Sequence, residues 1–145
     1  MDAFKQINDS HGHAVGDEVL REVSHALLDS LRPYDTCVRF AGDEFVVLLA
    51  DCPPEIAELK RRELQQRIES IDVQAGSAAV RVGASAGAAV YPHDGLTYEA
   101  LLESADKRMY SDKSDRRTHG RSRPAPVRDR EPVPVAPATA ARLQD

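Results

Sequence analysis

Apolar residues recur at helical spacing in three parts of the chain. The first stripe consists of Val15, Val19, Leu20, Val23, Ala26, Leu27 and Leu31. It predicts a helix that Pro33 ends, with Asp17 and Glu18 in its first turn. Two further stripes predict helices over residues 55–70 and 97–112. Their buried positions would be Ile56, Leu59, Leu64 and Ile68 in one helix, and Tyr98, Leu101, Leu102, Ala105 and Met109 in the other.

Runs of β-branched and aromatic residues predict the strands. Residues 36–40 and 45–50 flank the turn-forming residues 41–44, and this arrangement predicts a β-hairpin. A further strand is expected over residues 79–90, which are small or β-branched. Residues 8–13 are turn formers and are expected to lie between regular elements.

The predicted order is helix, strand, strand, helix, strand, helix. Sequential strands with intervening helices favour an α+β fold, in which helices pack on an antiparallel sheet. A ferredoxin-like βαββαβ unit has this order with one more strand at its start. That strand would have to lie before residue 4, so we expect the first strand to be largely missing from this chain.

Composition narrows the class of protein. The chain has 145 residues, of which 30% are charged and 41% hydrophobic, as is usual for a soluble globular domain. No apolar run is long enough to span a membrane, and no apolar segment follows Met1 as in a signal peptide. Cys37 and Cys52 are too few for a disulfide framework or a zinc site, so a cytoplasmic location is expected.

The charge and proline content change near the C-terminus. Residues 1–106 carry ten more acidic than basic side chains, and residues 107–145 carry five more basic than acidic ones. Five of the nine prolines lie in residues 118–145, which contain no aromatic residue. We therefore expect a folded domain over residues 1–117 and a disordered Pro/Arg-rich tail over residues 118–145. The tail lacks the interleaved aromatic residues and long basic runs that would indicate nucleic-acid binding.

Two carboxylates stand side by side at the tip of the predicted hairpin. Asp43 and Glu44 follow Gly42 within the stretch Arg39–Phe45. Taken alone, this stretch is compatible with ordinary turn chemistry. Other motifs surround it in a fixed order: FKQIND at residues 4–9, Gly12-His13 and Gly16-Asp17 before it, and Ala105-Asp106, Tyr110, Lys113 and Arg117 after it.

Over residues 1–117 this set resembles the GGDEF family of diguanylate cyclases. The resemblance implies a nucleotide-cyclase or palm-like version of the ferredoxin-like fold. It also implies an enzyme that works as a homodimer and condenses two GTP into cyclic di-GMP, with release of pyrophosphate. Magnesium or manganese would be the cofactor, because these cations prefer carboxylate and phosphate oxygens.

The resemblance also implies a role for each matched residue. Asn8 and Asp17 would bind guanine, because an amide and a carboxylate complement its donors and acceptor. Lys5, Lys113 and Arg117 would bind the triphosphate, although Lys113 and Arg117 could also be a solvated basic helix end. Gly42 would allow close approach of the nucleotide. Asp43 and Glu44 would be the catalytic acids, with Asp43 and the backbone carbonyl of Met1 holding the metal.

A second site is implied just before the hairpin. Arg32 and Asp35 match the RxxD pattern at which the family's product, cyclic di-GMP, binds and inhibits. Arg32 could instead only cap the preceding helix. A non-catalytic module that binds cyclic di-GMP through this pair is the alternative function.

Three departures from the family pattern bear on activity. Ser114, Asp115 and Arg116 precede Arg117, where the family usually has a glycine just before the arginine. Ala41 stands in place of the first glycine of the signature, which is a mild change where φ is negative and a strained one where φ is positive. Asp2 matches the second aspartate of the family's metal-binding pair, whereas the first would lie before Met1. We therefore expect weak metal binding by this chain.

Overall fold

The computed structural model describes residues 1–118, with side chains through residue 116. The helices are α1 (Phe4–His11), α2 (His13–Asp29), α3 (Pro54–Glu69) and α4 (Tyr98–Thr118). The strands are β1 (Thr36–Ala41), β2 (Glu44–Leu48), β3 (Asp72–Ala75) and β4 (Ala78–Arg81). The expected tail lies outside the described residues except for Thr118, which ends α4. Within the described part, no helix is long and apolar enough to cross a membrane.

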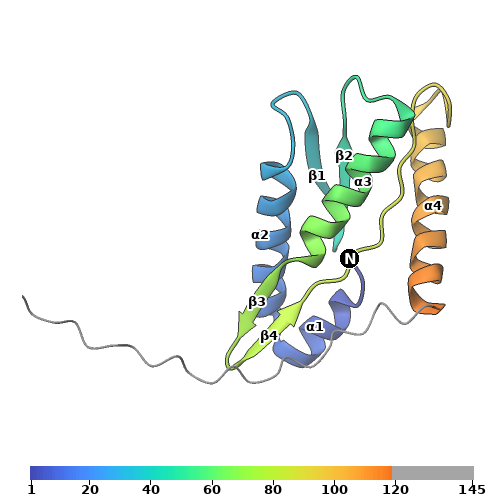
Figure 1. The fold of residues 1–145 in the computed structure, drawn as a ribbon. Helices are drawn as coiled ribbons and strands as arrows, with labels where there is room; N and C mark the ends of the chain where they lie inside the picture. Colours follow the sequence, from blue (N-terminus) through green and yellow to red (C-terminus); the bar gives the residue numbers. More distant parts are fainter. Residues whose placement is uncertain (119–145) are drawn as a thin grey trace, which may run out of the picture.

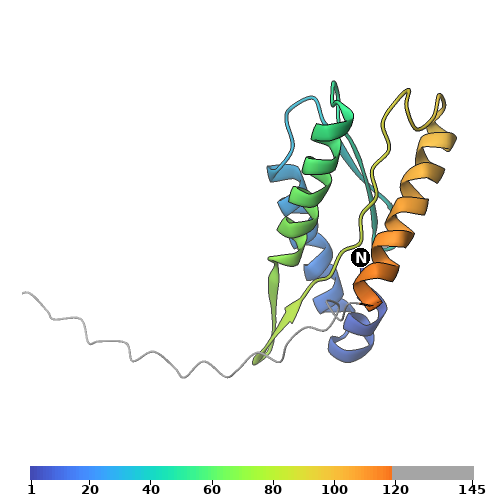
Figure 2. The ribbon, with the colours of Figure 1, turned by 45° about the vertical axis from the view of Figure 1, so that its right-hand side comes forward.

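The strands form two separate antiparallel pairs. In the first, β1 pairs with β2 from Thr36↔Leu48 to Ala41↔Glu44, with an irregularity between Arg39 and Ala41. In the second, β3 pairs with β4. Figures 1 and 2 show β1 and β2 behind α2 and α3, with α4 on the far side of the extended segment that follows β4.

The core lies between α2, α3 and the strands. Its fully buried centre consists of Val19 and Val23 of α2. Further buried members are Ile7, Leu27, Leu64, Ile68, Val73, Val80, Val82 and Ala84. The inner face of the hairpin adds Cys37, Phe45 and Val47, which pack against this cluster. Burial in these surroundings raises the pKa of the Cys37 thiol.

The outer face of the hairpin is apolar but exposed. Val38, Phe40 and Leu48 alternate with the core-facing positions and are 45%, 56% and 55% exposed. Strands with one apolar face in the core usually carry polar residues on the other face.

The α+β class with antiparallel strands and helices packed on them is confirmed, and four local predictions are wrong.

The first wrong prediction is the turn over residues 8–13. Residues 8–11 belong to α1, and only Gly12, with φ 84°, separates α1 from α2. Packing of Ile7 in the core outweighs the weak helix propensity of the polar residues that follow it. Because α2 begins at His13, Asp17 lies beyond its first turn.

The long strand expected over residues 79–90 is shorter. Pairing ends at Arg81, apart from an isolated bridge between Asp2 and Gly83. The sequence pattern does not predict β3, the partner of β4, because Asp72–Ala75 is only four residues long. The hairpin of β3 and β4 turns at Gly76, which has φ 65°. Residues 84–90 have no ladder partner among the described residues, so they are not a strand.

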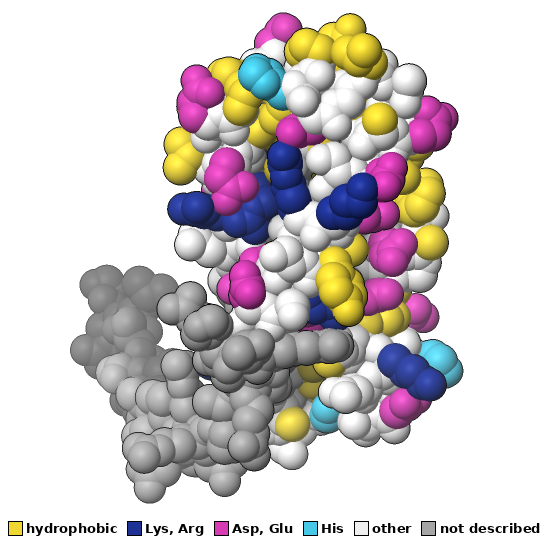
Figure 3. Space-filling view, turned by 90° about the vertical axis from the view of Figure 1, so that its right-hand side faces the viewer, with side chains coloured by type: hydrophobic (Ala, Val, Ile, Leu, Met, Phe, Trp, Pro, Cys, Tyr) yellow, Lys and Arg dark blue, Asp and Glu magenta, His cyan; other side chains and the backbone are white. Residues whose placement is uncertain are grey.

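Several residues expected in the core lie at the surface. Leu59 is 61% exposed and Tyr98 is 51% exposed, and Ile56 is also exposed. Figure 3 shows hydrophobic side chains at the upper end of the face that it presents, with basic and acidic side chains intermingled below them. Helical periodicity gives the spacing of an apolar stripe, but not which neighbour covers each end of it.

Candidate functional site

The hairpin tip is fixed by its own backbone geometry. Gly42 has φ 49°, a conformation that glycine adopts without strain, and its carbonyl accepts a 2.7 Å hydrogen bond from Arg39 Nε. Ala41 is not among the residues with positive φ. Its methyl group is therefore accommodated, and the departure from glycine at this position introduces no backbone strain.

Asp43 lies beside the first residue of the chain. The Met1 amino group donates to the Asp43 carbonyl at 2.9 Å and pairs with Asp43 Oδ2, also at 2.9 Å. Glu44 is exposed at the start of β2. The two acids predicted as catalytic thus stand at one tip, where one carboxylate is neutralised by an ammonium group and the other faces solvent.

A second polar cluster adjoins this tip through Asp2. The Asp2 carboxylate accepts hydrogen bonds from Ser85 Oγ at 3.0 and 2.8 Å, and its Oδ1 lies 3.6 Å from Lys113 Nζ. Because Met1 and Asp2 are consecutive, the hairpin acids and Lys113 of α4 are brought to the same region. Lys113 is partly exposed, so its ammonium group remains accessible to an anion.

The Asn8 side chain packs closely against Gly16 of α2. A Cβ added to Gly16 would be 1.9 Å from Asn8 Oδ1, so only glycine fits there. Asn8 Oδ1 is buried and has no hydrogen-bond partner among the described residues. A buried polar atom without a partner is costly to the fold. Lys5 and Asp17 are both exposed.

Asp35 is bonded to the backbone of its own loop, whereas the Arg32 side chain is exposed. Asp35 Oδ2 accepts from the Arg32 amide at 3.0 Å, and Asp35 Oδ1 accepts from the Ala50 amide at 3.1 Å. The Arg32 guanidinium lies 5.9 Å from the Tyr34 ring centroid and donates to the Tyr34 hydroxyl at 3.4 Å. The carboxylate is therefore occupied by backbone groups, whereas the guanidinium stays at the surface.

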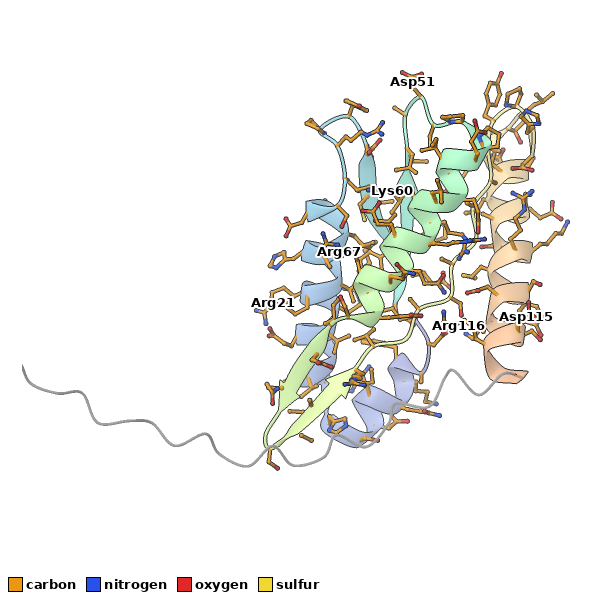
Figure 4. The ribbon with its side chains drawn as sticks, in the orientation of Figure 1. Arg21, Asp51, Lys60, Arg67, Asp115 and Arg116 are labelled. Atoms are coloured by element: carbon orange, nitrogen blue, oxygen red, sulfur yellow. The ribbon has the colours of Figure 1, made fainter. Side chains whose placement is uncertain are left out.

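Some relevant residues carried no signal in the sequence. Ser85 lies in a stretch of small residues without a motif, and only the fold brings it to Asp2. Gln65 is buried and joins α3 to Asp112 of α4 at 2.9 Å. Arg116 pairs with Glu69, and Figure 4 shows it at the lower end of α4. The Arg117 side chain lies outside the described residues, so its predicted role stays a prediction.

Comparison with known proteins relates this chain to one family. The model of the family described as "Diguanylate cyclase, GGDEF domain" matches residues 1–119. The bifunctional diguanylate cyclase/cyclic di-GMP phosphodiesterase MucR of Pseudomonas aeruginosa is 40% identical over 117 residues, which are 81% of this chain and 17% of MucR. The chain thus spans only a minor part of that relative's length.

Solved structures agree with this relationship. The GGDEF domain of YfiN (TpbB) from Pseudomonas aeruginosa is 37% identical with a TM-score of 0.71, and the match covers 79% of this chain and 71% of that one. The GGDEF domain of DgcB from Caulobacter crescentus, solved in complex with c-di-GMP, is 26% identical with a TM-score of 0.67. That match covers 79% of this chain and 68% of DgcB. The ordered motifs, the hairpin geometry and these matches together show that the chain belongs to the GGDEF family of diguanylate cyclase domains.

Proposed function

We propose that this chain is the catalytic domain of a diguanylate cyclase that works as a cytoplasmic homodimer, each subunit presenting one GTP. The reaction joins the 3′-hydroxyl of one GTP to the α-phosphate of the other, and pyrophosphate leaves. The observation that carries the proposal is the tip of the β1–β2 hairpin, where Asp43 and Glu44 follow an unstrained Ala41-Gly42 turn. Membership of the family supports the same reaction class.

The residues around the tip suit the parts of a GTP molecule. The amide of Asn8 and the carboxylate of Asp17 would bind the guanine base, whose N1 and N2 groups donate. Lys113, with Lys5 and Arg117, would balance the charge of the phosphates. Glu44 would help to withdraw the proton from the attacking 3′-hydroxyl, since its carboxylate is exposed at the tip.

The described residues do not form a complete binding site for a divalent cation. Magnesium or manganese would need several oxygen ligands, but no group of three or more His, Cys, Asp or Glu side chains gathers in the described part of the chain. Asp43 is paired with the Met1 ammonium, and Asp2 is bonded to Ser85. We therefore derive no step through a metal held by Asp43 and the Met1 carbonyl.

The test compares the chain with a version extended before Met1 by a short strand that carries an aspartate two positions before Asp2. Each is incubated with GTP and Mg²⁺, and cyclic di-GMP is measured by chromatography. The extended version should form product and the original little or none. Asp43→Asn in the extended version should lower the rate at least about 100-fold, as expected for loss of electrostatic transition-state stabilisation.

The matched control is Asp51→Asn in the loop between β2 and α3, at the upper end of the molecule in Figure 4, which should leave the rate unchanged. Product formed at a similar rate by the original chain would show that residues 1–145 suffice for catalysis. An unchanged rate in extended Asp43→Asn would contradict the role given to the hairpin tip.

A second candidate function is a module that binds cyclic di-GMP without catalysis, or with feedback inhibition of it. The supporting observation is the surface-exposed Arg32 guanidinium, which can fork onto a phosphate or the Hoogsteen edge of guanine. Calorimetry with cyclic di-GMP tests it: Arg32→Ala should weaken binding at least about tenfold, or 1.4 kcal/mol. Binding with no turnover in the extended version would favour the module over the enzyme.

A further inference from the structure

Two polar contacts join α3 to the C-terminal half of α4. The Gln65 side-chain amide donates to Asp112 Oδ2 at 2.9 Å, and Arg116 forms an ion pair with Glu69. The contacting residues are four positions apart on both helices, and residues four apart lie on one face of a helix. The two contacts therefore lie one turn apart on facing sides of α3 and α4, which run in the same direction in Figure 1.

The Gln65 carboxamide is fixed by hydrogen bonds at both of its polar atoms. Its side chain is buried, Nε2 also donates to the Ala84 carbonyl at 2.7 Å, and Oε1 accepts from Arg61 at 2.7 Å. The Asp112 carboxylate accepts in addition from the Ala86 amide at 3.4 Å. A buried network whose members are all bonded allows few other arrangements. The position of Asp112 is therefore set by α3 and by the residues that follow β4.

The ion pair between Arg116 and Glu69 is partly removed from solvent. The two side chains are 18% and 33% exposed, and Figure 4 shows Arg116 at the lower end of α4. An exposed ion pair contributes little to stability, whereas breaking a buried pair leaves one charge without its partner. Loss of either residue would therefore weaken the attachment of this end of α4 to α3.

The C-terminal end of α4 has no apolar residue to pack. Tyr110 is the last aromatic or aliphatic residue of this helix and is 73% exposed, and residues 111–118 read SDKSDRRT. Burial of apolar surface therefore cannot set where this end lies. Polar contacts do so instead, among them those that Asp112 and Arg116 make with α3.

Each of these two residues is followed directly by a proposed ligand of the triphosphate. Lys113 follows Asp112, and Arg117 follows Arg116. Successive residues of a helix are turned by about 100°, so the two cations share a face next to the one that contacts α3. Lys113 Nζ lies 3.6 Å from Asp2 Oδ1 and its side chain is 37% exposed. One face of α4 thus holds the helix, and the adjacent face carries the cations.

We propose that Asp112 and Arg116 are positioning residues: their contacts with α3 fix the end of α4 so that the cations next to them meet the triphosphate of GTP. This inference rests on the proposed function. The Asp112 carboxylate and the Arg116 guanidinium are engaged with α3 and do not contact the nucleotide themselves. Cations that are held in place before GTP arrives avoid the entropic cost of ordering them on binding.

Net charge alone predicts the opposite effect of a substitution at Asp112. Removing a carboxylate beside a cationic site strengthens the attraction of an anion. If Asp112 positions the helix, the same removal weakens binding of GTP. Asp112→Asn separates the two effects further, because it removes the charge but keeps an oxygen that accepts from Gln65.

Isothermal titration calorimetry of GTP with the full chain measures these effects. Asp112→Ala should weaken binding at least about fivefold, because small misplacements of binding groups are costly. Asp112→Asn should stay within about twofold of the unaltered chain, since its hydrogen bond is kept. Glu103→Ala is the matched control: it removes an exposed carboxylate of α4 that pairs with Lys107 on the same helix, and should leave the affinity unchanged.

The ion pair is tested by exchanging its partners. Arg116→Glu alone should weaken GTP binding at least about tenfold, because two carboxylates would then face each other. Adding Glu69→Arg restores a pair of opposite charges and should recover most of the affinity. A double variant that binds no better than Arg116→Glu would show that the Arg116 guanidinium acts on the phosphates directly, and would overturn its positioning role.

Amide hydrogen exchange without nucleotide provides a second measurement. Asp112→Ala should speed exchange of the amides of residues 113–117 at least about tenfold, because the end of α4 opens more often. The amides of Val19 and Val23 in the core should be unaffected. Equal acceleration at the core and at the end of α4 would mean that Asp112 stabilises the fold as a whole, and would overturn the proposal.

Failure of this inference differs from failure of the proposed function. Loss of affinity in Lys113→Ala but not in Asp112→Ala, or tighter binding by Asp112→Ala, would contradict only the inference. An affinity that Lys113→Ala leaves unchanged, or no binding of GTP by the unaltered chain, would contradict the proposed function as well. If Asp112→Ala does not fold, the exchange of Arg116 and Glu69 still decides.

Discussion

At the scale of single residues, Asp35 holds two loops together through backbone hydrogen bonds, in addition to its predicted role in binding cyclic di-GMP. Its two carboxylate oxygens accept from the amides of Arg32 and Ala50, which joins the end of α2 to the end of β2. The backbone of the same turn is closed by the Asp35 amide on the Arg32 carbonyl. Any assay of cyclic di-GMP binding that replaces Asp35 will therefore also change the loop that carries Arg32.

We predict that Asp35→Ala lowers the free energy of unfolding by about 1–2 kcal/mol, because two backbone amides lose a charged acceptor. Urea denaturation followed by circular dichroism measures the change. Asp29→Ala, an exposed position on α2, is the control and should stay within about 0.5 kcal/mol of the unaltered chain. Equal stability of the two variants would show that the Asp35 hydrogen bonds do not stabilise the fold.

At the scale of elements, α3 is tied to the segment after β4 by Arg61. This guanidinium donates to Glu58 at 2.9 and 2.8 Å, to Gln65 at 2.7 Å, and to the Ala86 carbonyl at 3.3 Å. Hydrogen bonds from Arg61, assisted by Arg62, lower the pKa of Glu58 to about 2 from its ordinary value of 4.5. The same pairing raises the pKa of Arg61.

This shift makes stability depend on pH in a defined direction. A carboxyl whose pKa is lower in the folded state stabilises the fold above its unfolded value, and the contribution disappears as the pH falls through its folded value. We expect stability to fall between about pH 4.5 and pH 2, and Glu58→Gln to flatten part of this dependence. Thermal melts at half-unit pH steps measure both slopes.

Glu99→Gln provides the comparison for this prediction, because it removes an exposed carboxylate on α4. Its melting temperature should follow that of the unaltered chain at each pH. If the melting temperatures of Glu58→Gln and the unaltered chain changed equally with pH, the Arg61–Glu58 pairing would be contradicted.

At the scale of the whole molecule, α4 is held by a close approach to Gly87. A Cβ at this residue would lie 2.0 Å from the Ala105 carbonyl oxygen and 2.6 Å from the Met109 amide nitrogen. These are backbone atoms of α4, so the helix itself would have to move to admit a methyl group. The Gln65–Asp112 and Arg116–Glu69 contacts would be loosened by the same movement.

Gly87→Ala should therefore lower the free energy of unfolding by about 1–3 kcal/mol, the usual cost of overpacking. Differential scanning calorimetry measures the loss. Gly83→Ala is the matched control, since its methyl group would meet only the Asp2 side chain, at 3.3 Å, and the loss should be smaller. A larger effect at Gly83 than at Gly87 would contradict the packing described for α4.

Periodicity in the sequence predicted three of the four helices and the hairpin, because α2, α3 and α4 each bury a stripe and the hairpin has its turn chemistry in place. The ordered motifs identified the family and named Asp43, Lys113 and Asn8. Pattern alone failed at residues 8–11, which are polar but helical, and at Asp72–Ala75, which is too short for a periodic signal.

The sequence by itself determined the family and the α+β class, and it predicted the acids of the hairpin tip, because these depend on residue types at fixed spacing. Only the tertiary structure decided that Ser85 bonds to Asp2, that Asp35 is occupied by backbone amides, and that residues 84–90 pair with no strand among the described residues. Strand pairing is a long-range property: the same apolar run is a strand beside a partner and a free edge without one.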